Sequence, residues 1–142
     1  MRAAWAKFSQ GKAAPRLDVL VCNAGVLLNE LTLTSERVEV TFACHLLFGT
    51  YLLGKLALPA LEATAGGRLV VVSSGGMYNS KFPSWETAAS LEGEFSGNLA
   101  YAFAKRGQVL LCYAQPPHVA SAPVLFRLRA LSADLSDHCE QL

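Results

Sequence analysis

Two apolar runs constrain the fold of this chain most strongly, because few architectures bury strands that are apolar on both faces. The first run covers Leu17 to Cys22 and ends at the small-residue turn Asn23-Ala24-Gly25, and the second runs from Arg68 to Ser74 and is rich in valine. Continuous apolar strands of this kind are typical of parallel sheets covered by helices. The sequence therefore predicts an α/β fold.

Helical periodicity between and after the two strands supports this interpretation. Apolar residues recur at helical spacing from Ser35 to Leu61, and the segment from Asn98 to Ala114 is predicted to be a second long helix. Residues Gly75 to Gly97 are polar and irregular, which predicts a loop with one short helix. A weaker helix candidate runs from Leu125 to Leu135. Alternating strands and helices with short connections indicate parallel strands joined by right-handed crossovers.

Composition limits the classes of protein that the chain resembles. Its 142 residues are 52% hydrophobic and 16% charged, as expected for one folded domain or a piece of a larger one. The net charge of +1 gives no basis for nucleic-acid binding. The four cysteines form no Cys-x-x-Cys pair, which argues against a metal site or a disulfide framework and favours a reducing, intracellular compartment.

Two segments bear on membranes and targeting. The apolar stretch from Phe42 to Gly54 is predicted to be too short to span a membrane and to form a buried helix. Residues 1–12 are basic and contain no acid, a pattern shared by mitochondrial presequences and by ordinary amphipathic helices. Both interpretations of this segment stay open, and so does the compartment.

The chemistry of the chain is predicted from Tyr101 and Lys105. Two residues four positions apart on a helix project from the same face. A free phenol titrates near pH 10, too high for acid–base work at neutrality, and a neighbouring ammonium group stabilises the phenolate. Together with Ser74 at the end of the second strand, this pair predicts a hydride-transfer site.

Three motifs in this order resemble the short-chain dehydrogenase/reductase family over about residues 17–114. They are Asn23-Ala24-Gly25, Val72-Ser73-Ser74 and the Tyr-x-x-x-Lys segment from Tyr101 to Lys105. The resemblance implies a Rossmann-like parallel sheet, NADP or NAD as cofactor, and a small carbonyl or alcohol as substrate. It also implies homo- or hetero-dimers formed through the two long helices.

The resemblance assigns a role to each motif. Ser74 would orient the substrate oxygen, Tyr101 would exchange a proton with it, and Lys105 would bind the nicotinamide ribose. The turn formed by Asn23, Ala24 and Gly25 would pack near the adenine ribose. Phe82 and Trp85 are expected either to line a lipophilic substrate mouth or to cover the core.

The sequence departs from the family pattern in several places. It contains no Gly-x-x-x-Gly-x-Gly motif and no strand ahead of Leu17, so we expect a truncated member whose first βαβ half is missing. The helix after the first strand lacks the family's asparagine, and His45 lies near that place. This histidine either holds a water or relays a proton, or is a buried residue bonded to backbone.

These departures shape the predicted organisation and function. We expect an amphipathic helix remnant at 1–16, a catalytic-half domain at 17–114 and a divergent tail at 115–142. The predicted function is that of an NAD(P)-dependent oxidoreductase impaired by truncation. The alternative is a catalytically inactive fragment that binds a full-length relative through its two long helices.

Overall fold

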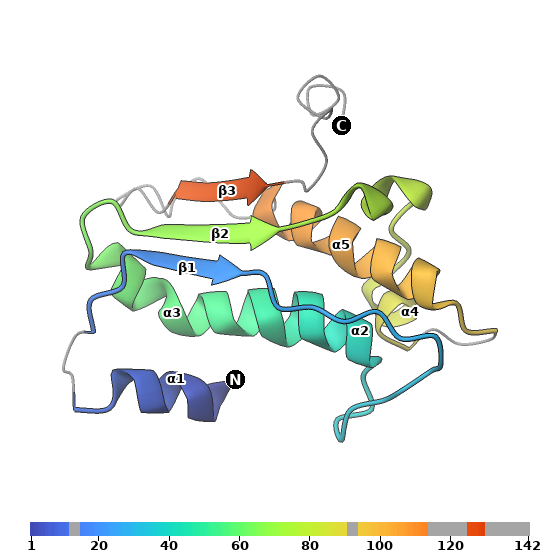
Figure 1. Cartoon of the computed structure of the whole chain (residues 1–142), viewed down its shortest axis with the longest axis horizontal. Helices are drawn as coiled ribbons and strands as arrows, with labels where there is room; N and C mark the ends of the chain where they lie inside the picture. The colour runs from blue at the N-terminus through green and yellow to red at the C-terminus, as the bar shows by residue number, and fades with distance from the viewer. Residues whose placement is uncertain (12–14, 91–93, 114–124, 130–142) are drawn as a thin grey trace.

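The computed structural model describes residues 1–11, 15–90, 94–113 and 125–129 of the chain. Its sheet has three parallel strands, β1 (Val19–Cys22), β2 (Arg68–Val72) and β3 (Leu125–Arg129), with β2 in the centre (Figure 1). Because all three strands are parallel, the residues that follow β1 and β2 emerge at the same edge of the sheet. The predicted α/β class with a parallel sheet is confirmed.

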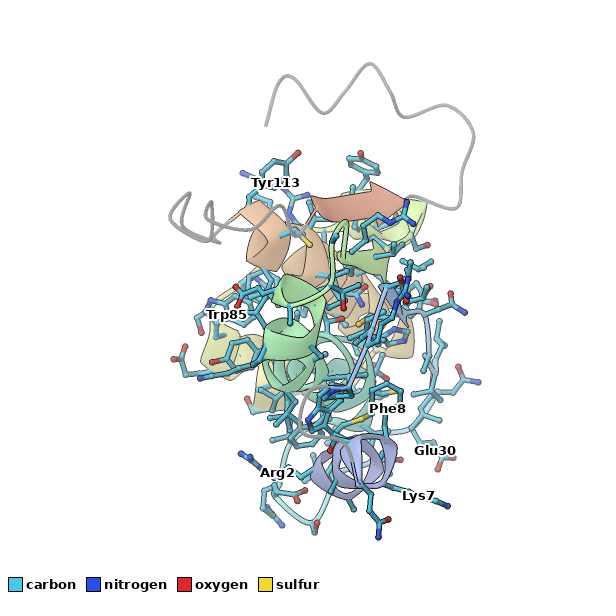
Figure 2. The ribbon with its side chains drawn as sticks, turned by 90° about the vertical axis from the view of Figure 1, so that its left-hand side faces the viewer. Arg2, Lys7, Phe8, Glu30, Trp85 and Tyr113 are labelled. Carbon is cyan, nitrogen blue, oxygen red and sulfur yellow. The ribbon has the colours of Figure 1, made fainter. Side chains whose placement is uncertain are left out.

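One long helical run connects β1 to β2. It consists of α2 (Val40–Phe42), η1 (Ala43–Leu52) and α3 (Leu53–Glu62), and a second long helix, α5 (Gly97–Tyr113), follows β2 (Figure 1). The described residues also form three shorter helices: α1 (Arg2–Ser9), the 3-10 helix η2 (Gly75–Asn79) and α4 (Trp85–Ser90). Figure 2 shows α1 and its labelled residues at the opposite end of the molecule from Tyr113, the last residue of α5.

The apolar side chains form two core clusters, one under the sheet and one between the helices. The first cluster joins β1 and β2 to α3, and α1 and α5 each add one side chain to it. Its members are Trp5, Leu17, Leu20, Cys22, Ala57, Leu61, Leu69, Val71 and Cys112. The second cluster joins the start of the long helical run to α4 and α5. Its buried members are Phe42, Leu46, Ala88, Ala100 and Phe103.

The start of the long helical run differs from the prediction. The helix begins at Val40 rather than at Ser35, because the chain turns sharply just before it. Arg37 donates its backbone N–H to Thr34 and adopts a positive φ of 64°, and Leu33 pairs with Glu39 across this turn. Left-handed backbone is unfavourable for a residue other than glycine and ends regular structure there.

The helix predicted from Leu125 to Leu135 is wrong over its first half. Residues 125–129 form β3, which pairs with β2 in parallel, from Arg68 opposite Leu125 to Val72 opposite Arg129. The apolar and basic residues of this segment alternate after its first leucine, which is a strand pattern. The remainder of the predicted helix lies outside the described residues, as does most of the predicted tail. The predicted loop from Gly75 to Gly97 contains two short helices, η2 and α4, rather than one.

The length argument against a membrane span is also wrong. The helical run continues to Glu62, so the segment Val40–Glu62 has 23 residues and is long and apolar enough to cross a bilayer by length and composition alone. Half of its most apolar window is buried inside the structure, and core helices of soluble proteins pass the same test. The absence of a membrane span therefore stays a prediction.

The buried carboxylate of Glu39 provides a test of how the long helical run is held. Glu39 is fully buried, and its two oxygens accept hydrogen bonds from the backbone N–H groups of Thr41 and Phe42 at 2.8 and 2.7 Å. We expect the Glu39→Ala variant to lower the free energy of unfolding by about 2–3 kcal/mol, because a charged cap is lost and buried donors are left unpaired. The exposed Glu36 is the matched control, and urea unfolding of Glu36→Ala should differ from the parent by less than about 0.5 kcal/mol.

Two thiols in the first core cluster predict a loss of stability in alkali. Burial raises the pKa of Cys22 and of Cys112 to about 11, from an ordinary value of 9.0. Each thiol has a higher pKa in the folded chain than in the unfolded chain, so the unfolded chain loses its thiol protons first as pH rises. The stability that the protonated thiols contribute is therefore complete below pH 9 and is lost as pH rises towards 11. The loss should be on the order of 2 kcal/mol per thiol. Urea unfolding between pH 8 and pH 11 should show a shallower fall for Cys22→Ala and Cys112→Ala than for the parent.

Candidate active site

Two consecutive serines, Ser73 and the predicted catalytic residue Ser74, follow β2 at the edge of the sheet. Ser73 is fully buried, and its hydroxyl donates a hydrogen bond to the backbone carbonyl of Lys105 at 2.9 Å. Ser74, the next residue, is half-buried, and its Oγ accepts the N–H of Gly76 at 3.3 Å as the 3-10 helix η2 begins. The two consecutive serines therefore have different surroundings, and only Ser74 lies partly open to solvent.

Helix α5 positions the other two predicted catalytic residues. Tyr101 is half-buried and Lys105 is 4% exposed, one helical turn further along. The Lys105 Nζ lies 5.6 Å from the centroid of the Tyr101 ring. The predicted common face of the pair is thus observed, with the ammonium group near the aromatic ring.

Gly76 defines how close Ser74 and Tyr101 lie to each other. A Cβ placed on Gly76 would be 3.7 Å from Ser74 Oγ and 3.4 Å from Tyr101 Cε1. Both groups therefore border the same small space at the carboxyl end of β2. The structure brings Ser74, Tyr101 and Lys105 together, although they come from separate elements.

The surroundings of Lys105 determine how it can act. Its Nζ donates a hydrogen bond to the backbone carbonyl of Val72 at 2.8 Å. Burial lowers the pKa of Lys105 from its ordinary value, and the nearby Cys44 opposes that shift. An ammonium group has three donors, so the bond to Val72 leaves two for a ligand.

The predicted cofactor-binding turn lies at the same edge of the sheet. Asn23, Ala24 and Gly25 follow β1 directly and are exposed, while Ser74 follows the neighbouring strand β2. In open parallel sheets, ligands bind outside the carboxyl ends of the strands. The turn and the three side chains thus occupy the edge at which such a sheet binds its ligands.

His45 is a site residue to which the sequence assigned no settled role. Its side chain is 97% buried, and its ring meets that of Tyr101 edge-on, with centroids 5.2 Å apart and planes at 89°. Its Nε2 lies 2.8 Å from the carbonyl oxygen and 3.0 Å from the amide nitrogen of Val26. These contacts confirm a buried histidine bonded to backbone, but Nδ1 has no partner among the described residues.

Gln108 was missed in the sequence, and it joins the two helices behind the site. It is 1% exposed, and its Nε2 donates to the backbone carbonyl of His45 and to Thr50 Oγ1, both at 2.9 Å. The signal was available, because Tyr101, Lys105 and Gln108 are spaced i, i+4 and i+7 on one helix.

The two aromatic residues predicted either to line a substrate mouth or to cover the core have different surroundings. Phe82 packs against the core cluster between the helices. Trp85 is 47% exposed and meets the rings of Phe82 and Phe42 edge-on at 4.7 and 6.3 Å. Phe82 thus covers core, whereas Trp85 borders an apolar hollow of about 250 Å³. Its lining is Phe42, Leu46, Leu47, Tyr51, Trp85 and Leu111.

Curated relatives of the chain are dehydrogenases and reductases. The chain is 36% identical over 110 residues to dehydrogenase/reductase SDR family member 12 of Bos taurus, covering 78% of this chain and 34% of that protein. The human protein of the same name is 36% identical over 107 residues. Retinol dehydrogenase 14 of Mus musculus is 47% identical over 60 residues, 42% of this chain and 18% of that protein. No protein-family model matches the sequence.

Solved structures share the fold. A 3-alpha-hydroxysteroid dehydrogenase from Pseudomonas sp. B-0831, solved with NADH, superposes with a TM-score of 0.68 and 22% identity, covering 91% of this chain and 53% of that one. A metagenomic short-chain oxidoreductase, solved with NADP, gives 0.59 and 24% identity, with 94% and 56% covered. At these identities the likeness concerns the fold.

The chain spans about a third of the length of the curated relatives that it matches first. Within that span the homology covers about three quarters of this chain, and the solved structures superpose on about nine tenths of it. By homology and by fold, the chain belongs to the short-chain dehydrogenase/reductase family.

Proposed function

We propose that this chain carries the catalytic residues of an NAD(P)-dependent oxidoreductase that interconverts small carbonyls and alcohols. The observation that carries the proposal is the convergence of Ser74, Tyr101 and Lys105 at the carboxyl end of β2. The family membership of the chain supports this reaction class.

In this proposal, each side chain acts on the substrate oxygen or supports the residue that does. The Ser74 hydroxyl donates a hydrogen bond to the oxygen and fixes its orientation. The phenol of Tyr101 gives up its proton as a carbonyl is reduced, and takes one as an alcohol is oxidised. The Lys105 ammonium group, near the Tyr101 ring, stabilises the negative charge that develops on the phenol oxygen.

A nicotinamide cofactor fits the donor groups at this edge of the sheet. Lys105 has two N–H donors beyond the one bound to Val72, and ribose hydroxyls accept such bonds. The exposed turn from Asn23 to Gly25 lies beside the same edge, where its small residues permit close backbone approach. When bound, the cofactor supplies the hydride, and the protein supplies position and electrostatics.

The proposed substrate is a lipophilic carbonyl or alcohol. Ser74 and Tyr101 supply the polar contacts for one oxygen at the carboxyl end of β2. The similarity to a protein named retinol dehydrogenase supports an apolar substrate.

The second proposed function is binding to a full-length relative or to another copy through the outer side of the two long helices. Tyr51, Leu110 and Tyr113 are 44%, 40% and 62% exposed there. Tyr51 and Leu111 line both apolar hollows of this region, the one beside Trp85 and another of about 240 Å³ next to Leu58. Exposed aromatic and aliphatic residues around apolar hollows are typical of protein interfaces.

The Tyr101→Phe variant tests the proposed catalysis. We expect reduction of a lipophilic aldehyde with NADPH or NADH to fall by at least about a hundredfold, because the proton donor is lost while the ring stays in place. Tyr78→Phe, at an exposed tyrosine of η2, is the matched control and should retain the parent rate. Equal rates for the parent and the Tyr101 variant would contradict the proposed role of the phenol.

Cofactor binding is measured separately from turnover. In a thermal melt, cofactor at a hundred times its dissociation constant adds about 2.7 kcal/mol to the stability of the folded chain. A rise in melting temperature with NADPH or NADH therefore supports binding of a nicotinamide cofactor. A cooperative melt whose midpoint changes with neither compound contradicts such binding by this chain.

The Leu110→Glu variant tests the binding function. We expect a charge at this exposed position of α5 to abolish self-association, or co-purification with a full-length relative, because an unpaired carboxylate would be buried in the proposed interface. Leu31→Glu is the control, since Leu31 has similar exposure in the loop after β1. Analytical ultracentrifugation at several concentrations measures the association. An association that is unaffected by Leu110→Glu would place the interface elsewhere.

A further inference from the structure

The imidazole of His45 lies between the loop after β1 and the ring of Tyr101. On one side, its Nε2 is within 3.0 Å of both backbone polar atoms of Val26. On the other side, its ring meets the Tyr101 ring edge-on at a centroid distance of 5.2 Å. The histidine therefore forms a physical link between the predicted cofactor-binding turn and the proposed catalytic phenol.

Gly25 is the residue that makes room for this link. A Cβ on Gly25 would overlap Cε1 of the His45 imidazole and would lie 2.8 and 2.9 Å from its two nitrogens. Those distances are too short for any side chain at position 25 unless the imidazole moves. The His45 imidazole thus fills the space that a side chain at position 25 would occupy.

The backbone of His45 is fixed as firmly as its ring. Its carbonyl oxygen accepts hydrogen bonds from Thr50 Oγ1 at 2.7 Å and from Gln108 Nε2 at 2.9 Å. Gln108 lies three residues beyond Lys105 on α5, so this bond ties His45 to the helix that carries Tyr101. Because both the backbone carbonyl and the imidazole of His45 are hydrogen-bonded, the residue has little freedom to move. It can therefore restrict the movement of the Tyr101 ring.

The electrostatic surroundings favour a neutral imidazole at this position. Burial lowers the pKa of His45; its bond to the Val26 backbone acts in the opposite sense, and the charge of Lys105 adds a smaller lowering. A neutral ring avoids a second buried cation close to the Lys105 ammonium group. His45 thus contacts Tyr101 as a neutral ring, and the positive charge near the phenol is that of Lys105.

We propose that His45 is a positioning residue for Tyr101, which it holds in place from the backbone of Val26 through the space left by Gly25. The inference rests on the proposed function of Tyr101 as proton donor. Proton transfer requires the donor to be within a few tenths of an ångström of its productive position. The inference also predicts that a change in the turn after β1 reaches Tyr101 through His45.

The test uses the full chain labelled with 13C at the tyrosine ring, so that Tyr101 can be observed with or without turnover. The chain has four tyrosines, and the signal that disappears in Tyr101→Phe identifies Tyr101. Two variants change the link from opposite ends. His45→Gln keeps a polar end group for Val26 but removes the ring, and Gly25→Ala keeps the ring but displaces it. Gly54→Ala is the matched control, a buried glycine whose added methyl would meet Leu69 instead.

We expect both His45→Gln and Gly25→Ala to shift the Tyr101 signal while the other three tyrosine signals stay in place. With NADPH and a lipophilic aldehyde, kcat of both variants should fall about tenfold to a hundredfold, and His45→Gln should show little change in KM for the cofactor. Gly54→Ala should leave the Tyr101 signal and kcat unchanged. In a His45→Ala background, adding Gly25→Ala should have no further effect on the Tyr101 signal, because the ring that transmits the displacement is gone.

The outcomes separate this inference from the proposed function. An unchanged Tyr101 signal in folded His45→Gln and Gly25→Ala would overturn the positioning role, whatever the activity of the parent. A shift caused by Gly25→Ala that persists in the His45→Ala background would also overturn it, because the effect would then bypass His45. A shifted signal in both variants of a parent without turnover supports the contact and counts against the proposed catalysis instead.

Discussion

The arrangement of the site depends on the junction between the end of β2 and helix α5. Two hydrogen bonds cross it in opposite directions. The Ser73 hydroxyl donates to the backbone carbonyl of Lys105, and the Lys105 ammonium group donates to the backbone carbonyl of Val72. All three residues are buried, so neither bond is exchanged readily for bonds to water. This junction sets both the position of α5 along the strand and the direction of its Tyr101 face.

A second layer of buried polar groups supports the junction from behind. Gln108 joins α5 to the long helical run through the carbonyl of His45, and Thr50 donates to the same oxygen. Three polar atoms of this region lack protein partners among the described residues: Thr41 Oγ1, His45 Nδ1 and Gln108 Oε1. Buried polar atoms without partners are uncommon and concentrate where a structure serves chemistry as well as stability. One of the three, His45 Nδ1, belongs to a ring that contacts Tyr101, which agrees with the site proposed on this edge of the sheet.

Much of this arrangement could be predicted from residue patterns. The valine-rich run at β2 and the i, i+4 spacing of Tyr101 and Lys105 are local features, and each appears where it was expected. The late start of the long helical run depends on a positive φ at Arg37, which no residue type there signals. The strand β3 depends on pairing with β2, a long-range contact that outweighs weak local preference. The contact between His45 and Gly25 joins residues 20 positions apart and becomes visible only when the loop after β1 folds back over the helix.

The segment η1 is a π-helix, whose turns are wider than those of an α-helix, and this limits how the long helical run can vary. In η1, the Thr50 side-chain hydroxyl donates to the carbonyl of His45, and an added side chain on Gly49 would meet the backbone of Cys44. Each such turn holds more residues than a regular α-helical turn, so it rotates everything that follows relative to everything before. Phe42, just before η1, and Leu46, in its first half, face the helical core, whereas Ala57 and Leu61 after it face the sheet. The run thus serves two cores of different orientation with one continuous helix, and a one-residue deletion inside η1 would put these two faces out of register.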